Sequence, residues 1–201
     1  MSELRTRHAE ITRTTGETDV SLSVGLDGTG AGTRSTGVGF FDHMLDLLAR
    51  HGKLDLEVDV TGDLQTGSHH TVEDTGIVLG QAIDRALGDR TGIRRYGHAV
   101  VPMDEARAAA AIDLSGRPFL VWEGLPIPRG VTGGFEHELA EELFRAISSA
   151  ARLTLHVELQ AGTNAHHMIE AIFKAVARAL RVAVSIDPEE TGVPSTKGTL
   201  T

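Results

Sequence analysis

The sequence has no cysteine among its 201 residues. That absence excludes disulfide bonds and thiolate metal sites, and it favours a reducing, cytoplasmic location. Aromatic residues make up only 4% of the chain, so aliphatic side chains must build most of the core. The sequence also lacks an apolar run long enough to span a membrane and a charged-then-apolar leader, so neither a membrane span nor a signal segment is expected.

Positive charge is scarce as well. Lysine and arginine together number 19 against 28 acidic residues, and the formal net charge is −9. No basic stripe in the sequence offsets this excess, which argues against nucleic acid as the main partner. A small anionic ligand is not excluded, because a few local cations are enough to hold one.

Histidine, in contrast, occurs in two matched motifs. Residues 69–74 read HHTVED and residues 166–171 read HHMIEA, so a glutamate follows each His-His pair three residues after its second histidine. The two motifs are separated by nearly half of the chain. Such a recurrence indicates an internal duplication, and imidazole with carboxylate at helical spacing is typical of a metal site.

The context of the two motifs is repeated too. Each is preceded by a segment of helical periodicity, then by a strictly alternating strand pattern, then by a polar loop. These helices are expected at 41–52 and 136–151, and these strands at 54–60 and 153–160. A second, long helix is expected to begin at each His-His pair.

Each half is also expected to open with a β-hairpin. The first covers 8–26 and turns near Gly16, with Glu17 just past the turn, and the second covers 97–116 and turns near Asp104 and Glu105. Propensity alone would make the alanine run of the second hairpin a helix, but the repeat favours a strand. The predicted fold class is therefore α+β and internally duplicated: residues 1–93 and 94–201 each form a small mixed β-sheet with two helices packed on one face.

Helix geometry decides how the motifs could bind metal. Successive side chains on a helix point about 100° apart. His69 therefore shares a face with Glu73, whereas His70 points in another direction, and the second motif behaves in the same way. Each motif thus suits two ions, which we expect to be shared between helices and between subunits.

The register of the repeat adds two further candidates, because His43 in the first half corresponds to Glu142 in the second. The candidate metal ligands are His43, His69, His70, Glu73, Glu142, His166, His167 and Glu170. Divided equally between two ions, they give each ion four protein ligands. Four ligands would complete a tetrahedral zinc site but would leave a six-coordinate ion such as Mn²⁺ with open positions. Asp42 and Asp74, beside these residues, are candidates for orienting the imidazoles.

Several segments taken together resemble imidazoleglycerol-phosphate dehydratase, an enzyme family of histidine biosynthesis. They are TGVGFFDHML (36–45), GSHHTVED (67–74), MDEA (103–106), DLSGRP (113–118), NAHHMIEAIFKAVARALR (164–181) and PSTKG (194–198). They follow the family's order along almost the whole chain, and the combination is far more specific than any one motif.

The resemblance implies a carbon–oxygen hydro-lyase that converts D-erythro-imidazole glycerol phosphate into imidazole acetol phosphate and water. It implies two Mn²⁺ ions per active site, with Fe or Zn as alternatives. It also implies a homo-oligomer of 24 subunits, built from trimers, with the metal sites at subunit interfaces. The eight candidate ligands coincide with the family's metal positions, except that Glu142 stands where some members have histidine.

The resemblance also implies how the reaction proceeds. The hydrogen to be removed lies on a carbon with no carbonyl beside it, so the imidazole ring of the substrate must accept electron density. A metal-bound imidazolate that leads to a diazafulvene-like intermediate would allow this. Glu17 is the first candidate for acid/base chemistry, and a metal-bound hydroxide is the second.

The family's remaining site positions carry over as well. Catalytic positions fall on Glu17, His43, Glu73 and Glu170, and substrate-binding positions fall on Glu17, Arg95, Arg117, Lys174, Ser195, Thr196 and Lys197. Leu47 stands where the family can carry a substrate-contacting glutamine, so that polar contact is lost or replaced. The C-terminal tail is expected to order over the phosphate and to shield the reaction from water.

Two other functions remain open. A metal-stabilised assembly protein without turnover would explain the divergent His-His pairs, but it would leave Glu17, Arg117 and Lys197 without a role. A dinuclear metallohydrolase of phosphate esters would need a bridging carboxylate, and the two halves offer no obvious one. Incubation with imidazole glycerol phosphate separates the three functions. The dehydratase yields a ketone, the metallohydrolase yields inorganic phosphate, and the assembly protein yields neither.

Overall fold

A computed structural model describes residues 7–200 of the chain. The first half contains β1 (His8–Thr14), β2 (Thr18–Gly25), β3 (Arg34–Ser35), α1 (Gly39–Gly52), β4 (Asp55–Gly62), the short 3-10 helix η1 (Leu64–Thr66) and α2 (His69–Leu87). The second half contains β5 (Tyr96–Met103), β6 (Ala106–Asp113), β7 (Phe119–Gly124), β8 (Val131–Thr132), β9 (Phe135–Glu136), α3 (Leu139–Ala150), β10 (Thr154–Ala161) and α4 (Ala165–Val184).

The two halves have the same topology. Their four-stranded sheets have the orders β1-β2-β4-β3 and β5-β6-β10-β7, and in each sheet the last strand runs parallel to its neighbour while the others are antiparallel. The predicted α+β fold with two similar halves is confirmed. The position of the boundary between the halves, near residue 93, stays a prediction.

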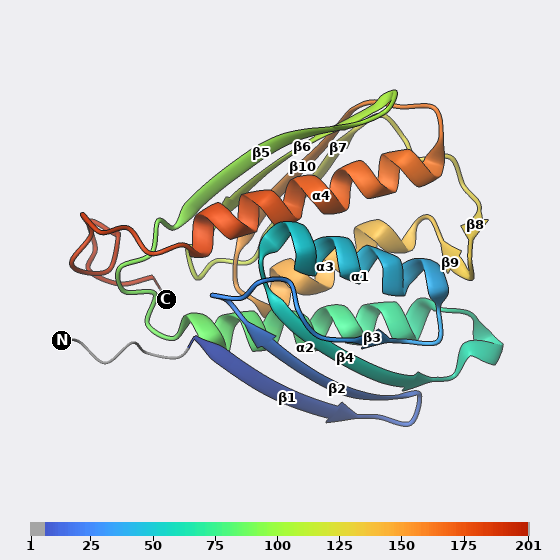
Figure 1. Ribbon diagram of the computed structural model, residues 1–201, viewed down its shortest axis with the longest axis horizontal. Coiled ribbons are helices and arrows are strands. Elements are labelled where there is room, and N and C mark those ends of the chain that lie inside the picture. The colour runs from blue at the N-terminus through green and yellow to red at the C-terminus, as the bar shows by residue number, and fades with distance from the viewer. Residues whose placement is uncertain (1–6, 201) are drawn as a thin grey trace.

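The sheets form the outer layers of the molecule and the four helices lie between them (Figure 1). Helix α2 packs on β1 and β2, helix α4 packs on β5 and β6, and in the middle α1 contacts α4 while α2 contacts α3. The buried apolar side chains form one cluster shared by both halves. No helix within residues 7–200 is long and apolar enough to cross a membrane.

All four helices begin at the same end of the molecule, on the right in Figure 1. The His-His pairs are in the first turns of α2 and α4, and His43 and Glu142 are near the starts of α1 and α3. The fold therefore gathers all eight predicted ligands at one end. The C-terminal tail lies at the opposite end, on the left in Figure 1.

Both predicted hairpins are present. Thr14 pairs with Asp19 around the turn at Gly16, and Met103 pairs with Ala106 around the turn at Asp104–Glu105. The alanine run forms strand β6, as the repeat predicted, because the packing of α4 overrides helix propensity. At Gly97 on the neighbouring strand, an added Cβ would lie 2.0 Å from the Ala179 carbonyl oxygen of α4, so this sheet and helix are close enough to require small residues.

Helix α3 begins at Leu139 rather than at residue 136, where the periodicity placed its start. Phe135 and Glu136 instead pair with Val131 and Thr132 as the small β8–β9 ribbon. The first half has no such ribbon between its edge strand and its first helix in the described chain. The repeat is therefore approximate at this point.

Candidate metal centre

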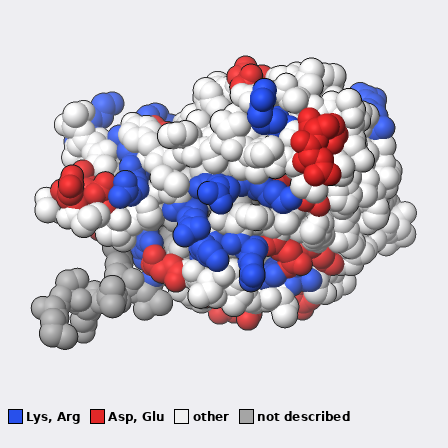
Figure 2. All heavy atoms as spheres, turned by 45° about the horizontal axis from the view of Figure 1, so that its top comes forward, with Lys and Arg blue, Asp and Glu red and all other residues white. Residues whose placement is uncertain are grey.

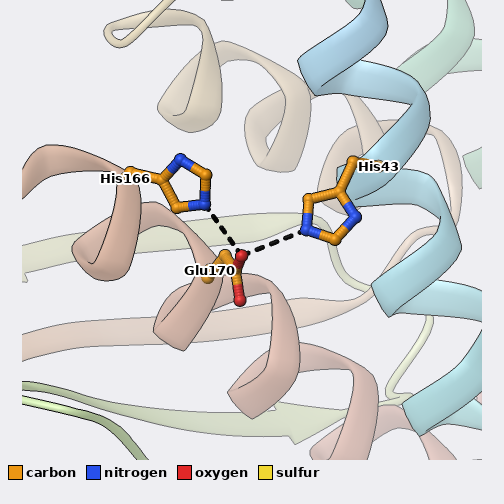
Figure 3. A group of neighbouring side chains, drawn as sticks. All are labelled: His43, His166 and Glu170. Atoms are coloured by element: carbon orange, nitrogen blue, oxygen red, sulfur yellow. Dashed lines mark hydrogen bonds and ion pairs between the residues drawn. The ribbon is translucent and has the colours of Figure 1, made fainter.

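His43 on α1 and His166 on α4 both point at the carboxylate of Glu170, one turn further along α4 (Figure 3). The Nε2 atoms of His43 and His166 lie 3.0 Å and 2.9 Å from Glu170 Oε1. The potential ligand atoms of the three side chains all lie within 4.8 Å of one another. Residues from both halves of the duplicated chain therefore converge on one point.

The Glu170 carboxylate is held in its charged form. Its residue is only 5% exposed, and Lys174 Nζ donates to its Oε2 at 2.5 Å. Burial by itself would raise the pKa of Glu170, but hydrogen bonds from Lys174, His43 and His166 lower it to about 2. The centre therefore combines an anionic oxygen, two imidazoles and an adjacent ammonium group.

Phe40 covers one side of this group. Its ring centroid lies 4.9 Å from that of His166 and 6.4 Å from that of His43, and it also packs against Phe135 of the β8–β9 ribbon. Phe40 was not among the predicted site residues, although its position three residues before His43 places both on one helix face.

The donor set fits a first-row transition metal. Two imidazole nitrogens with a carboxylate oxygen and no sulfur suit Mn²⁺, Fe²⁺ or Zn²⁺. Because Glu170 Oε1 contacts both imidazoles, the three donors already surround a small common volume. His43, His166 and Glu170 would hold one ion and leave further coordination positions for other groups.

The corresponding residues of the repeat, His69, Glu73 and Glu142, do not converge on one point within a single chain. His69 Nε2 lies 3.7 Å from Glu73 Oε2 on α2, which is the predicted shared face. Glu142 on α3 instead lies beside Arg145, with Oε2 3.7 Å from the arginine Nε. Glu73 and Glu142 line the same cavity of about 370 Å³, so they are neighbours, although their side chains form no contact with each other. The role of Glu142 as a ligand stays a prediction.

The two histidines of each motif diverge as helix geometry predicted. The rings of His69 and His70 are edge-on at 88°, and so are those of His166 and His167. While His69 faces Glu73, His70 donates through Nδ1 to Asp63 at 3.1 Å and turns its Nε2 toward Glu17, 3.7 Å from Oε1. The hydrogen bond to Asp63 raises the pKa of His70.

His167 has a matching carboxylate partner. Its Nδ1 donates to Glu105 Oε2 at 2.7 Å, which raises the pKa of His167. The other Glu105 oxygen accepts hydrogen bonds from the backbone N–H groups of Thr163 and Asn164, just before α4. The contact with His167, followed by these backbone contacts, lowers the pKa of Glu105 to about 2. A hydrogen bond at Nδ1 leaves Nε2 as the atom with which His167 could bind a metal ion.

The prediction that Asp42 and Asp74 orient the imidazoles was wrong. Asp42 accepts hydrogen bonds from the backbone and hydroxyl of Thr36, and Asp74 pairs with Thr18 and Arg13. Sequence adjacency misled here, because a residue next to a helical ligand points away from it. The carboxylates that contact the Nδ1 atoms of His70 and His167 are instead Asp63 and Glu105, which lie in the loop and the hairpin turn at this end of the molecule.

The predicted phosphate-binding residues lie elsewhere, around Asp113. Arg95 donates to both carboxylate oxygens of Asp113, at 2.7 Å and 3.1 Å, and to the Pro194 carbonyl oxygen at 2.8 Å. Arg117 is exposed, and its Nη2 lies 3.6 Å from Asp113 Oδ2. Three of the five N–H groups of Arg95 are thereby used, while Arg117 keeps its planar fork facing solvent.

The tail residues complete this second group. Ser195 Oγ accepts a hydrogen bond from the Lys197 backbone N–H at 3.2 Å, and Thr196 and Lys197 are exposed. Lys174 is apart from them, beside Glu170, and Leu47 is partly buried against the core. In one chain the structure therefore separates Lys174, midway along α4 beside Glu170, from the group around Asp113 and the tail.

A band of Lys and Arg side chains crosses the middle of one face of the molecule (Figure 2). Helix α4 presents Lys174, Arg178 and Arg181 at successive turns, and α1 contributes Arg50 beside His51. Burial and the positive charges of Lys174, Arg178 and Arg50 lower the pKa of His51. Within residues 7–200 Arg50, Arg178 and Arg181 form no ion pair, so an acidic chain exposes unpaired positive charge on the two helices that carry the candidate metal centre.

Comparison with known proteins gives concordant results. Residues 36–180 match the family model described as imidazoleglycerol-phosphate dehydratase. The chain is 59% identical over 196 residues to the imidazoleglycerol-phosphate dehydratase of Granulibacter bethesdensis, covering 97% of this chain and 100% of the relative. It is 55% identical over 195 residues to that of Jannaschia sp., covering 96% and 100%.

Solved structures agree with the sequence relatives. The crystal structure of imidazoleglycerol-phosphate dehydratase from Staphylococcus aureus superposes with a TM-score of 0.81 at 40% identity, covering 90% of this chain and 99% of the other. The Pyrococcus furiosus structure in complex with (S)-C348 also has a TM-score of 0.81, at 35% identity, covering 94% and 100%.

Proposed function

Because this chain belongs to the imidazoleglycerol-phosphate dehydratase family, we propose that it is a metal-dependent hydro-lyase of histidine biosynthesis. It removes water from D-erythro-imidazole glycerol phosphate and releases imidazole acetol phosphate. The observation that carries the proposal is the position of Glu170. Its carboxylate contacts two imidazoles on one side and Lys174 on the other, so a metal-type donor set lies next to a cation that suits a phosphorylated substrate.

The metal requirement follows from the donor set and from the chemistry. We propose two Mn²⁺ ions per active site, with Fe or Zn as alternatives. When bound, such an ion supplies positive charge that favours the anionic form of an imidazole ring and lets the ring accept electron density. His43, His166 and Glu170 would hold one ion. Asp63 and Glu105 orient His70 and His167 through Nδ1, which prepares their Nε2 atoms for the same role.

Glu17 is the proposed acid/base residue. It lies at the turn between β1 and β2, its side chain is 57% exposed, and its Oε1 is 3.7 Å from His70 Nε2. An exposed carboxylate can exchange its proton with water between steps. One proton leaves the carbon next to the departing hydroxyl's carbon, the hydroxyl departs as water, and the resulting enol becomes the ketone. These events need one base and one acid, which a single carboxylate can supply in turn.

The phosphate would bind to cations from two separate groups. Arg117 and Lys197 are exposed near the C-terminal tail, and Lys174 lies midway along α4, beside Glu170. Because one chain holds these groups apart, we propose that each active site is built from more than one subunit, in an assembly of 24 built from trimers. The unpaired positive charge along α1 and α4 supports an anionic ligand near the interface. The cytoplasmic location stays a prediction.

A direct assay tests the activity. Protein loaded with Mn²⁺ is expected to convert imidazole glycerol phosphate into a ketone without releasing inorganic phosphate, and both products can be followed in one reaction. Phosphate release without ketone would establish the metallohydrolase, and neither product would establish an assembly protein without turnover. Reaction with Fe²⁺ or Zn²⁺ in place of Mn²⁺ shows which ion supports the highest turnover.

Thorough chelation is expected to dissociate the assembly. The two histidines of each motif point in different directions, so ions that join them to other chains hold subunits together, and removing the ions removes those links. Sedimentation velocity before and after chelation measures the change, and adding Mn²⁺ back is the control for damage. A sedimentation profile that stays the same in metal-free protein rules out interface metals.

A further inference from the structure

A buried arginine outside the metal centre has no role in the function described so far. Arg90 follows the end of α2, is only 1% exposed, and has a left-handed backbone with φ of 62°. Burial lowers the pKa of Arg90. A buried charge lowers the stability of the fold unless it is paired and hydrogen-bonded. The hydrogen-bond partners of Arg90 therefore indicate its structural role.

The guanidinium of Arg90 joins three separate parts of the chain. Its Nη2 donates to Asp84 Oδ1 of α2 at 2.5 Å and to the Ala151 carbonyl oxygen, at the end of α3, at 3.1 Å. Its Nη1 donates to the Leu200 carbonyl oxygen at 2.9 Å. A planar fork offers donors in several fixed directions, whereas the three N–H donors of a lysine ammonium all lie on one rotating nitrogen.

The contact with Leu200 closes the tail into a loop. Figure 1 shows the tail running outward and then back to the segment between α2 and β5. Arg95 holds the loop at the Pro194 carbonyl and Arg90 holds it at the Leu200 carbonyl, and the Leu200 side chain is buried. At Gly116 an added Cβ would lie 2.3 Å from the Leu200 carbonyl oxygen, so the backbone there is closely packed.

The middle of the loop carries the residues proposed to bind phosphate. The backbone N–H of Gly198 donates to the Ser195 carbonyl oxygen at 3.0 Å, which forms a turn that exposes Thr196 and Lys197. A loop held at both ends loses less conformational freedom when it binds a ligand than a free chain end does. The anchor at Leu200 therefore reduces the entropy lost on binding.

We propose that Arg90 is a positioning residue: it clamps the Leu200 carbonyl and so preforms the Ser195–Lys197 turn for the phosphate of the substrate. This inference rests on the proposed function, because it presumes that the turn contacts the phosphate. Arg90 touches no substrate. It acts through the loop. Its guanidinium links the loop to Asp84 of α2 and to the Ala151 carbonyl oxygen at the end of α3.

Two variants test the clamp from its two sides. Arg90→Lys keeps the charge but loses the fork, and a chain shortened to end at Thr199 leaves Arg90 with Asp84 and Ala151 but removes Leu200. In both, KM for imidazole glycerol phosphate is expected to rise on the order of tenfold while kcat changes little. Arg85→Lys, an exposed substitution on α2, is the matched control and is expected to leave both constants unchanged.

Hydrogen exchange gives a readout that does not depend on activity. The amides of Lys197 and Gly198 are expected to exchange on the order of ten times faster in both variants than in the parent protein. If the shortened chain keeps the parent KM and exchange rates, Arg90 does not position the loop. If only Arg90→Lys raises KM, Arg90 acts through the helices and the clamp is likewise refuted. Parent protein without dehydratase activity would refute the proposed function, while the exchange rates would still decide whether the clamp exists.

Discussion

Glu170→Gln is expected to lower the dehydration rate by at least about a thousandfold, the magnitude associated with losing a principal electrostatic group of an active site. The substitution keeps the shape of the side chain but removes its negative charge. His43 and His166 then have no anionic partner, and Lys174, whose side chain is only 15% exposed, has no counter-ion. The metal content, measured by elemental analysis, is expected to fall together with the rate.

The loss of activity must be separated from a loss of stability. Leaving Lys174 unpaired is expected to lower the free energy of unfolding by roughly 1–3 kcal/mol, which urea titration measures. The double variant Glu170→Gln with Lys174→Gln removes both charges and is expected to recover most of that stability but none of the turnover. Glu158→Gln, exposed on β10, is the control for substituting any glutamate. Turnover near the parent value in folded Glu170→Gln would falsify the proposed centre.

Glu17→Gln is expected to retain metal and assembly but to lose turnover by about a hundredfold or more, the usual contribution of a general acid or base. Glu17 lies outside the converging donor set, and its side chain is mostly exposed, so the amide should not disturb the fold. A steady-state assay, elemental analysis and sedimentation on the same preparation measure the three properties.

The matched control is Glu10→Gln, because Glu10 is an exposed glutamate on the same hairpin. It is expected to retain parent turnover. The alternative role for Glu17 is to hold His70 in place through their 3.7 Å contact. Under that alternative, metal would be lost together with turnover in Glu17→Gln. Parent turnover in this variant would remove Glu17 from the mechanism altogether.

Much of the fold was predictable because the same order of helices and strands is encoded twice in the sequence, so each half can be checked against the other. The alanine run of β6 shows this best, since propensity alone favours a helix and only its correspondence to the first half identifies a strand. The β8–β9 ribbon was not predictable in this way, because the first half has no counterpart to compare. The start of α3 was therefore placed three residues too early.

The site was predictable where it depends on helix geometry and not where it depends on loops. The angle between successive helical side chains correctly separated His69 from His70. It could not show that Asp63 and Glu105 approach these imidazoles, because their positions depend on how a loop and a hairpin turn fold back over the helix starts. Nor could sequence spacing show Arg90 at the tail, since that contact joins residues far apart in the chain.

The placement of the predicted ligands at one end of the molecule and of the tail at the other gives each chain a head and a foot, the ligand end and the tail end, which differ in chemistry. A contact from the head of one copy to the foot of the next would be heterologous, so it would continue from copy to copy until the path closes on itself. In a closed path every head meets a foot, and no copy is left with an unfilled end. The number of copies in such a ring would be set by the angle between neighbouring copies, and all of its active sites would be equivalent.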